Sequence, residues 1–266
     1  MKLVKYHALG NDYLFIDSAK EVFPGPKFVK QICHRNFGIG SDGILYGGIS
    51  GEKFAVTIIN PDASVAEISG NGVRIFARAM LDCGNVAIGN EFCVRTGPRQ
   101  VMCKIKSANE ISVDMGTPLF SAPNLPVGSK FGHKIIVNGR QYVCYPVSMG
   151  NPHCVIFVDE LAHEHVLSDG QILENNPAFT ERTNVQFAHI IDRNNIGIEI
   201  WERGAGYTLA SGSSACGVFA VARRLHSCAP AVSIHMTGGI LHIEETKSGT
   251  ILQTGSVEKI AECIIA

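Results

Sequence analysis

The two halves of this 266-residue chain repeat the same short motifs in the same order. Four pairs recur at offsets of 139 to 142 residues: Gly-Asn before an apolar segment that ends in aspartate (10–17 and 150–159), Ser-Gly before an apolar stretch (69–70 and 211–212), Thr-Gly inside a strand-like segment (96–97 and 237–238) and a closing glycine (Gly116 and Gly255). Ordered matches at nearly constant spacing are typical of an internal repeat. The sequence therefore predicts two copies of one module of about 115 to 140 residues, related by a pseudo-twofold axis.

The best boundary between the copies is Gly116-Thr117-Pro118, because glycine and proline interrupt both strands and helices. We expect an N-terminal domain over 1–116 and a C-terminal domain over 117–257, with the tail 258–266 returning to the first domain. Each of these domains is long enough to bury a core of its own.

Each copy is predicted to contain short strands around one apolar helix. Alternating apolar and polar residues predict strands, for example over 3–15, 54–59 and 101–105. Helical spacing of apolar residues predicts one helix per copy, over about 70–83 and about 213–226. Because each helix is largely apolar, it suits the centre of a curved sheet. The predicted fold class is α+β, with two pseudo-symmetric domains that each wrap a curved, mostly antiparallel sheet around a central helix.

The composition describes a folded protein and excludes several other classes. Hydrophobic residues make up 45% and charged residues 18% of the chain, unlike a disordered segment. A formal net charge of -1 gives no reason to expect nucleic acid or an anionic membrane as a partner. The opening residues do not resemble a signal peptide, and no apolar run approaches the roughly 18 residues that span a bilayer. We therefore expect a cytoplasmic protein.

The cysteines predict neither a metal site nor a disulfide framework. There are nine of them, an odd count, and none forms a C-x-x-C pair. Buried free thiols in a reducing compartment explain this pattern best.

Each predicted helix begins with a serine followed by small residues. The first start is Ser-Gly-Asn-Gly at 69–72 and the second is Ser-Gly-Ser-Ser at 211–214. The N–H groups of a first helical turn and the positive end of the dipole can bind a carboxylate or phosphate, which glycine lets approach closely. A single start of this kind is explained as well by an N-cap serine. Two copies, with Asn60 and Glu202 nine residues before the serines, favour a ligand site.

Two such starts facing one cleft would hold one anionic ligand between two side chains. An enzyme needs this geometry to remove a proton from one face of a carbon and return it to the other face.

The residues around both helix starts resemble the diaminopimelate epimerase family. The segment 60–74 is similar to the family segment that ends in Cys-Gly-Asn-Gly-x-Arg, and 201–213 is similar to the second catalytic segment, where Ala-Cys-Gly is expected. The remaining family blocks match in order, at 7–12, 38–42, 149–153 and 181–184. The resemblance spans nearly the whole chain and implies two similar domains with the active site in the cleft between them.

The resemblance implies a cofactor-independent mechanism. In this family two thiols flank the substrate α-carbon, one as thiolate base and one as thiol acid, without pyridoxal phosphate or metal. The matching positions here are Ser69 and Ser211, and His153 and Glu202 match the family residues that help ionise the thiols. Backbone N–H groups at the helix starts are expected to hold the α-carboxylate, and polar side chains the rest of the substrate. The implied substrate-binding residues are Asn11, Asn60, Gly70, Asn71, Asn151, Asn184, Arg203, Gly212 and Ser213.

Serine at both catalytic positions departs from the family pattern. A thiol has an unperturbed pKa of about 8.5, within reach of tuning at a helix N-terminus, whereas a serine hydroxyl is a much weaker acid. A pair of serines should therefore be a poor two-base catalyst, although ligand binding should survive. Two origins stay open: a deliberate exchange of both thiols, or natural divergence, which the accompanying changes at Tyr207, Ile75 and Ser214 favour.

The leading hypothesis is an isomerase of the lysine and cell-wall precursor pathway, converting LL- to meso-diaminopimelate and impaired by its serines. One alternative is racemisation of another amino acid, of the histidine or hydroxyproline type, which Tyr207 and Gly43 keep open. Under natural divergence, a racemisation with His153 or Glu202 as base also stays open. A second alternative is an amino-acid-binding protein without catalytic activity. Dimerisation is common in the family, so a homodimer is expected from the resemblance alone.

Overall fold

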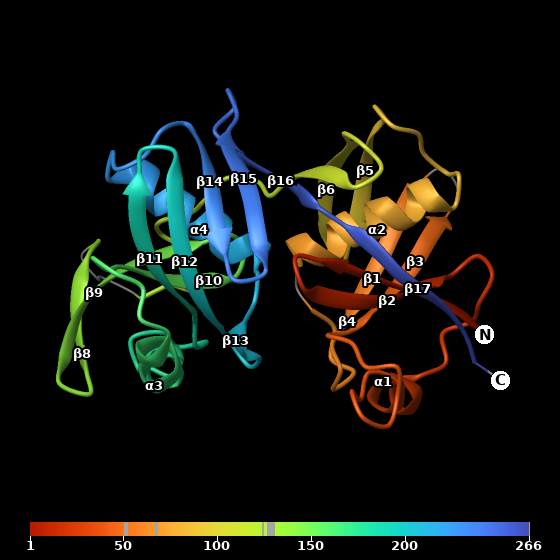
Figure 1. Cartoon of the computed structure of the whole chain (residues 1–266), viewed down its shortest axis with the longest axis horizontal. Helices are drawn as coiled ribbons and strands as arrows, with labels where there is room; N and C mark the ends of the chain where they lie inside the picture. Colours follow the sequence, from red (N-terminus) through yellow and green to blue (C-terminus); the bar gives the residue numbers. More distant parts are fainter. Residues whose placement is uncertain (51–52, 67–68, 124, 127–130, 266) are drawn as a thin grey trace. The chain divides into compact units, whose positions relative to one another are not determined.

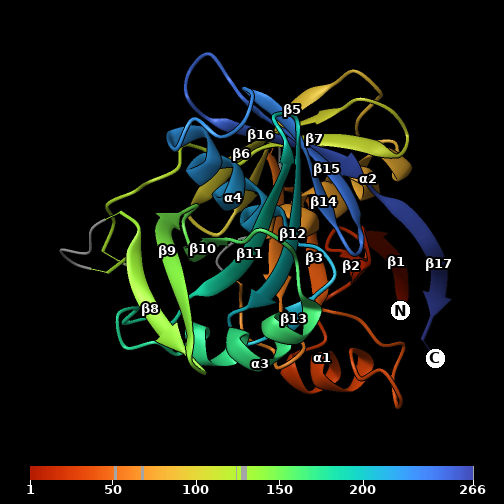
Figure 2. The ribbon, with the colours of Figure 1, turned by 60° about the vertical axis from the view of Figure 1, so that its left-hand side comes forward.

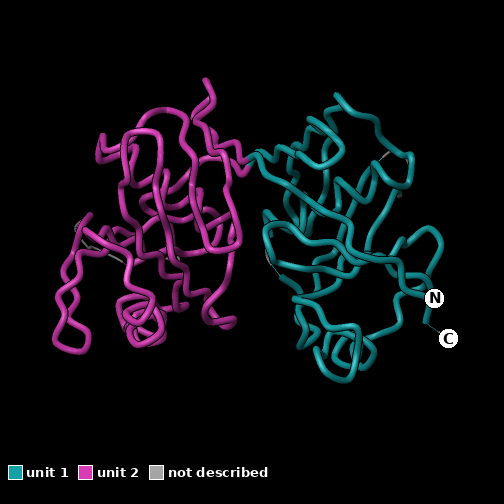
Figure 3. Tube along the Cα trace, viewed as in Figure 1, with its two compact units in different colours: residues 1–114, 254–266 teal, residues 115–253 magenta. Residues whose placement is uncertain are grey.

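The chain divides into two compact units, which Figure 3 distinguishes by colour. Unit 1 comprises Met1–Asp114 and Thr254–Ala266, and unit 2 comprises Met115–Gln253. The computed structural model describes residues 1–50, 53–66, 69–123, 125–126 and 131–265. Glu67 and Ile68, inside the motif at 60–74, lie outside the described residues.

The described part of unit 1 forms a mixed sheet with the helices α1 (Pro26–Ile32) and α2 (Gly70–Asp82) (Figure 1). Its strands are β1 (Lys2–Ala8), β2 (Asn11–Asp17), β3 (Ile44–Ser50), β4 (Lys53–Ile59), β5 (Glu91–Thr96), β6 (Arg99–Ile105), β7 (Glu110–Asp114) and β17 (Glu258–Ile264). They pair in the order β17-β1-β2-β3-β4-β5-β6-β7, antiparallel except for β2–β3 and β4–β5. The parallel pairs need crossover connections, which α1 and α2 provide.

Unit 2 has a similar succession of pairings. Its strands are β8 (His133–Val137), β9 (Arg140–Ser148), β10 (Pro152–Phe157), β11 (Asn184–Asp192), β12 (Asn195–Glu202), β13 (Gly206–Thr208), β14 (Ala231–Met236), β15 (Gly239–Glu245) and the first residues of β16 (Ile251–Ser256). The succession runs from β8–β9 to β14–β15, with the short strand β13 as an additional partner of β12. The hairpin of β8 and β9 (green in Figure 2) leads into β10 and β11, which are parallel, as are β12 and β14. The crossover helices are α3 (His163–Glu174) and α4 (Gly212–Arg224).

The two predicted apolar helices are confirmed, with corrected ends. α2 packs against β1, β2, β3, β4, β6 and β7 of its own unit, and α4 packs against β9, β10, β11 and β15. α2 ends at Asp82, with Cys83 as C-cap, because Gly84 adopts a φ of 74° and turns the chain away. α4 begins one residue earlier than predicted and ends at Arg224, two residues earlier, and His226 has a φ of 56°. Among the helices of the described ranges, none is long and apolar enough to cross a bilayer.

Two other predictions needed correction. The predicted strand over 3–15 is a hairpin of β1 and β2, because Leu9 and Gly10 both have positive φ and form a two-residue turn. Leu9 is a buried apolar residue, so the apolar pattern continues through the turn and gives no sign of it in the sequence. The helices α1 and α3 were not predicted at all. α3 has a weak apolar face because it buries two carboxylates, Asp169 and Glu174.

Candidate active site

The first helix start is an N-cap serine with a hydroxyl neighbour. Ser69 is extended, with φ -138° and ψ 112°, and its Oγ accepts a hydrogen bond from the Gly72 N–H at 3.0 Å. This is the favoured cap arrangement, because it satisfies a donor of the first turn. The Tyr13 hydroxyl on β2 lies 3.4 Å from the same Oγ. A Cβ at Gly72 would lie 3.3 Å from the Ser69 Oγ, so glycine lets the serine fold tightly onto the helix.

Two asparagines beside this start are held by hydrogen bonds on both sides. The Asn71 Nδ2 donates to the Asn11 Oδ1 at 3.1 Å, and the Arg74 guanidinium donates to the Asn71 Oδ1 at 2.6 Å. The Asn11 Nδ2 donates to the Asp42 carboxylate at 2.8 Å. Since Asn71 and Arg74 are buried, these bonds fix the amide orientations at the helix start.

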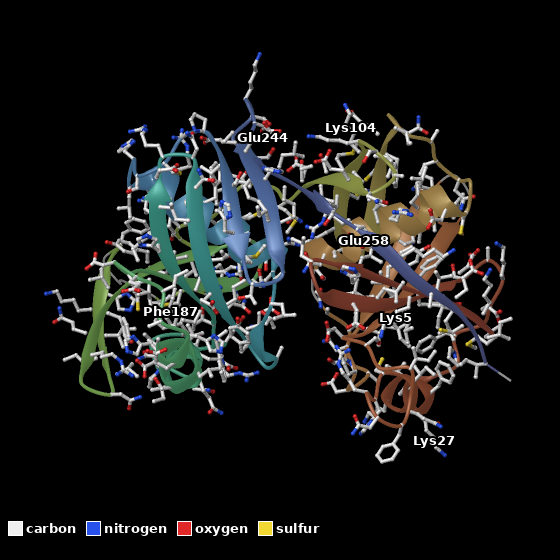
Figure 4. All side chains as sticks on the ribbon, viewed as in Figure 1. Lys5, Lys27, Lys104, Phe187, Glu244 and Glu258 are labelled. Atoms are coloured by element: carbon white, nitrogen blue, oxygen red, sulfur yellow. The ribbon has the colours of Figure 1, made fainter. Side chains whose placement is uncertain are left out.

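An ionic cluster supports β2 below the asparagines. The buried Asp12 carboxylate lies 2.8 Å from both the Lys5 Nζ and the Arg35 guanidinium, and Figure 4 labels Lys5. Burial acts to raise the pKa of Asp12, but hydrogen bonds from Arg35 and Lys5 outweigh it and lower the pKa below its usual range. Arg35 also forms an ion pair with Asp42, whose carboxylate accepts the hydrogen bond from Asn11. The ionic cluster is therefore linked to the asparagines at the helix start.

The second helix start is buried more deeply. Ser211 is extended and only 4% exposed, and its Oγ accepts from the Ser214 N–H at 3.5 Å. The Ser214 Oγ in turn accepts from the Gln186 Nε2 at 3.0 Å. A Cβ at Gly212 would lie 2.4 Å from the Oε1 of the buried Gln253, so a larger residue at this first helical position would have to displace that side chain.

His153 lies under the second start in a neutral hydrogen-bonded chain. Its Nδ1 lies 3.1 Å from the Gln186 Nε2, and its Nε2 lies 2.9 Å from the Asn151 Oδ1. The Asn151 Nδ2 donates to the Ser213 Oγ at 3.5 Å. Burial, and after it the positive charge of Arg203, lowers the pKa of His153 to about 3. The imidazole is therefore neutral across physiological pH, with Nδ1 accepting and Nε2 donating.

The remaining predicted residues of unit 2 lie at the start of β11 and around the end of β12. The buried Asn184 donates to the Pro152 carbonyl at 2.9 Å and accepts from the Arg203 N–H at 3.0 Å. The Arg203 guanidinium donates to the Glu181 carbonyl at 3.1 Å. Glu202 is half-buried at the end of β12, where it pairs with Gly206 of β13.

Comparison with known proteins decides the family. The family model described as diaminopimelate epimerase matches residues 3–120 and 145–260. A diaminopimelate epimerase 2 from Nostoc sp. is 45% identical over 270 residues, covering 98% of this chain and 94% of that relative. The chain belongs to the diaminopimelate epimerase family. A diaminopimelate epimerase from Moorella thermoacetica, at 36% identity, covers 92% of this chain and 91% of its own length. The family is one of isomerases that act as amino-acid epimerases.

Solved structures show the same fold at low sequence identity. A predicted epimerase from Pseudomonas aeruginosa has a TM-score of 0.72 at 13% identity, covering 99% of this chain and 98% of that one. A hydroxyproline epimerase from Agrobacterium vitis, with bound trans-4-OH-L-proline, has a TM-score of 0.68 at 12% identity, covering 99% and 90%. The mixed α and β fold class that the sequence predicted is thereby confirmed.

Within each unit the structure brings together most of the residues predicted from the family pattern. In unit 1, Ser69, Gly70, Asn71 and Asn11 gather at the start of α2, whereas Asn60 bonds within its own turn, to Ser64 at 2.9 Å. In unit 2, Gly212 and Ser213 open α4, and Ser213 is hydrogen-bonded through Asn151 to His153. A second group joins Asn184, at the start of β11, to Arg203, which follows β12.

The sequence analysis missed several residues that support these groups. Tyr13 and His153 stand 140 residues apart on β2 and β10, so the repeat itself could have indicated the tyrosine. Asp42 and Asn184 are related in the same way, at an offset of 142. Gln186 had no such signal, because its role depends on the pairing of β10 with β11. Across the described ranges, no group of His, Cys, Asp and Glu side chains could hold a metal ion.

Proposed function

We propose that the chain is an epimerase-type protein for a diamino-dicarboxylic acid such as diaminopimelate, with serine at both catalytic positions. The observation that carries this proposal is that Ser69 and Ser211 occupy the same place, the N-cap of a 13-residue helix, with Oγ on the N–H of the third helical residue. A thiolate at that place would gain the same N–H bond and the positive end of the dipole, which lower a thiol pKa.

In the proposed reaction the two positions act on opposite faces of one α-carbon. One group takes the α-proton, the other returns a proton to the opposite face, and the configuration inverts without any change in redox state. The substrate α-carboxylate is assigned to backbone N–H groups of the first turns, at Gly70 and Asn71 and at Gly212 and Ser213. Asn11 and Asn151 orient it, and Asn60, Asn184, Glu202 and Arg203 are assigned to the distal end.

Serine weakens this chemistry but not the binding. Proton transfer by a positioned group is typically worth about 10²- to 10⁴-fold, and a serine hydroxyl is too weak an acid to replace a thiol in that role. His153 does not compensate, because its pKa is about 3 and both ring nitrogens are engaged. Its contacts favour a positioning role, holding Asn151 toward Ser213, over the role of a base.

The test compares the serine protein with a Ser69→Cys/Ser211→Cys double variant. Both are incubated with LL- and meso-diaminopimelate in deuterated water, and α-hydrogen exchange is followed by NMR. We expect exchange in the double variant at least about 10²-fold faster than in the serine protein. Ser248→Cys, in an exposed turn, is the matched control for a thiol at another site. Silence of the double variant with both isomers would overturn the proposal.

A catalytically silent amino-acid-binding protein is the second candidate. It is favoured because both serine hydroxyls accept cap hydrogen bonds from the helix backbone, which stabilise the helices. An oxygen that already accepts such a bond is a poor base. A thermal-shift panel of diaminopimelate isomers, histidine and hydroxyproline separates the candidates, since a ligand at 100 times its Kd stabilises by about 2.7 kcal/mol. Stabilisation without exchange in any thiol variant would establish the silent binder. Selective stabilisation by histidine or hydroxyproline would favour the other racemases.

A further inference from the structure

A buried carboxylate at the end of α3 collects hydrogen bonds from two different segments. The Glu174 side chain is 6% exposed, and its Oε1 accepts from the Arg182 guanidinium and from the Gly204 N–H, both at 2.9 Å. Its Oε2 accepts from the Trp201 indole N–H at 2.8 Å. The Glu174 backbone carbonyl also accepts, from the Thr183 N–H at 3.1 Å. Such a carboxylate is stable when buried because its donors replace water.

These donors belong to the two segments assigned to the distal end of the substrate. Arg182 and Thr183 directly precede Asn184, while Trp201 and Gly204 flank Glu202 and Arg203. Both segments turn sharply, since Arg182 has a φ of 58° and Gly204 a φ of 79°. A positive φ is strained for arginine, so its ion pair with Glu174 helps to hold that turn.

The two segments also bond to each other around this anchor. The Arg203 N–H donates to the Asn184 Oδ1, and its guanidinium donates to the Glu181 carbonyl. The direction of the Arg203 and Glu202 side chains therefore depends on how the segment 201–204 is fixed, and Glu174 holds it at both ends.

We propose that Glu174 is a positioning residue that sets specificity for the distal amino-acid group of the substrate. The inference rests on the proposed function. Glu174 does not touch the reacting carbon in this assignment, but it fixes the loop that carries the distal contacts. Its loss should therefore weaken recognition of the distal group and leave proton transfer at the α-carbon little changed.

The test uses Glu174→Gln in the Ser69→Cys/Ser211→Cys protein. Glutamine keeps the shape, but its amide nitrogen cannot accept, so at least one of the three donors loses its partner. KM and kcat are measured with diaminopimelate and with 2-aminoheptanoate, which lacks both the distal amino and the distal carboxyl group. We expect KM for diaminopimelate to rise about tenfold, equivalent to about 1.4 kcal/mol, with KM for 2-aminoheptanoate and both kcat values nearly unchanged. Amide hydrogen exchange over 201–206 should accelerate in the same variant.

The matched control is Asp169→Asn on the same helix. Asp169 is also buried, but its donors are Arg140 and Tyr142 on β9, together with Asn138 and Ser168. This variant should lose stability without changing the ratio of the KM values for the two substrates or the rate of amide hydrogen exchange over 201–206. If Glu174→Gln does not fold, Trp201→Phe, which removes one donor only, takes its place. An unchanged ratio of the two KM values in Glu174→Gln, or an equal change in Asp169→Asn, would overturn the role of Glu174 and leave the proposed function standing. A double-thiol parent without exchange would overturn the proposed function and this role with it.

Discussion

The starts of α2 and α4 share an N-cap serine but stand in different electrostatic surroundings. Ser69 is half-exposed, beside a tyrosine hydroxyl and an asparagine pair tied to Asp42 and, through it, to Arg35. Ser211 is buried above a neutral chain that runs from Gln186 through His153 to Asn151. One repeated backbone feature is thus supported by charge in unit 1 and by neutral hydrogen bonds in unit 2. The two starts should therefore respond differently to thiols, to acid and to loss of the cap.

The largest effect is expected from single thiols. In the proposed reaction each start supplies the base for one face of the α-carbon, so Ser69→Cys and Ser211→Cys should each exchange the α-hydrogen of a different isomer. One should act on LL- and the other on meso-diaminopimelate, each about 10²- to 10⁴-fold faster than the serine protein. NMR of α-hydrogen exchange in deuterated water measures both rates. A single variant that exchanged both isomers equally would show that one base serves both faces, and the two starts would not have matched roles.

Acid should destabilise unit 2 through His153. The pKa of His153 is about 3 in the folded protein and about 6.5 in the unfolded chain, so the unfolded chain binds more protons between these values. The free energy of unfolding should therefore fall as pH drops below about 6.5, by up to about 1.4 kcal/mol per pH unit. Trp201 is the only tryptophan and lies in unit 2, so its fluorescence follows urea unfolding of that unit.

The variants His153→Gln and Tyr13→Phe separate this effect from other titrations. Burial also lowers the pKa of His133 in the same unit, which contributes a slope of the same sign. The slope between pH 6.5 and about 4.5 should therefore shrink in His153→Gln without vanishing, and Tyr13→Phe should leave it unchanged. The carboxylates of unit 2 with a lowered pKa, such as Asp169, add to the slope mainly near and below the unfolded-chain pKa of about 4, so the comparison stops at about pH 4.5. An unchanged slope in His153→Gln would show that His153 is not held neutral by its surroundings.

The sequence predicted the features that local pattern and repetition determine. Both N-cap serines and both apolar helices follow from spacing along the chain, and the duplication made their significance visible. Tyr13 could have been found only from the repeat, as the counterpart of His153. Gln186 could not be found from the sequence, because its contact with the second helix start depends on which strands pair and in which register. The helix α3 was not predicted for a related reason. Its buried positions include Asp169 and Glu174, which are polar in sequence and acceptable inside only because distant donors meet them.

Glycine replacement at the two starts should have unequal costs. At Gly212 an added Cβ would lie 2.4 Å from the Oε1 of Gln253, whose side chain is fully buried. At Gly72 the closest neighbour would be a Leu45 methyl at 3.2 Å, a contact that small shifts relieve. We expect Gly212→Ala to lose about 1–3 kcal/mol by overpacking. Gly72→Ala should be near neutral, because alanine gains up to about 1 kcal/mol of helix propensity. Urea unfolding measures both, and equal losses would contradict the difference in crowding.

The smallest expected difference concerns the caps themselves. The Ser69 Oγ accepts at 3.0 Å, whereas the Ser211 Oγ accepts at 3.5 Å, at the outer limit of a hydrogen bond. Ser69→Ala should therefore cost about 1 kcal/mol of unfolding free energy and Ser211→Ala only a few tenths. Thermal unfolding followed by circular dichroism gives both values. A larger loss in Ser211→Ala would mean that the buried hydroxyl makes a stronger bond than its distance to Ser214 indicates. It would also mean that a thiol installed there gives up more stability than one installed at Ser69.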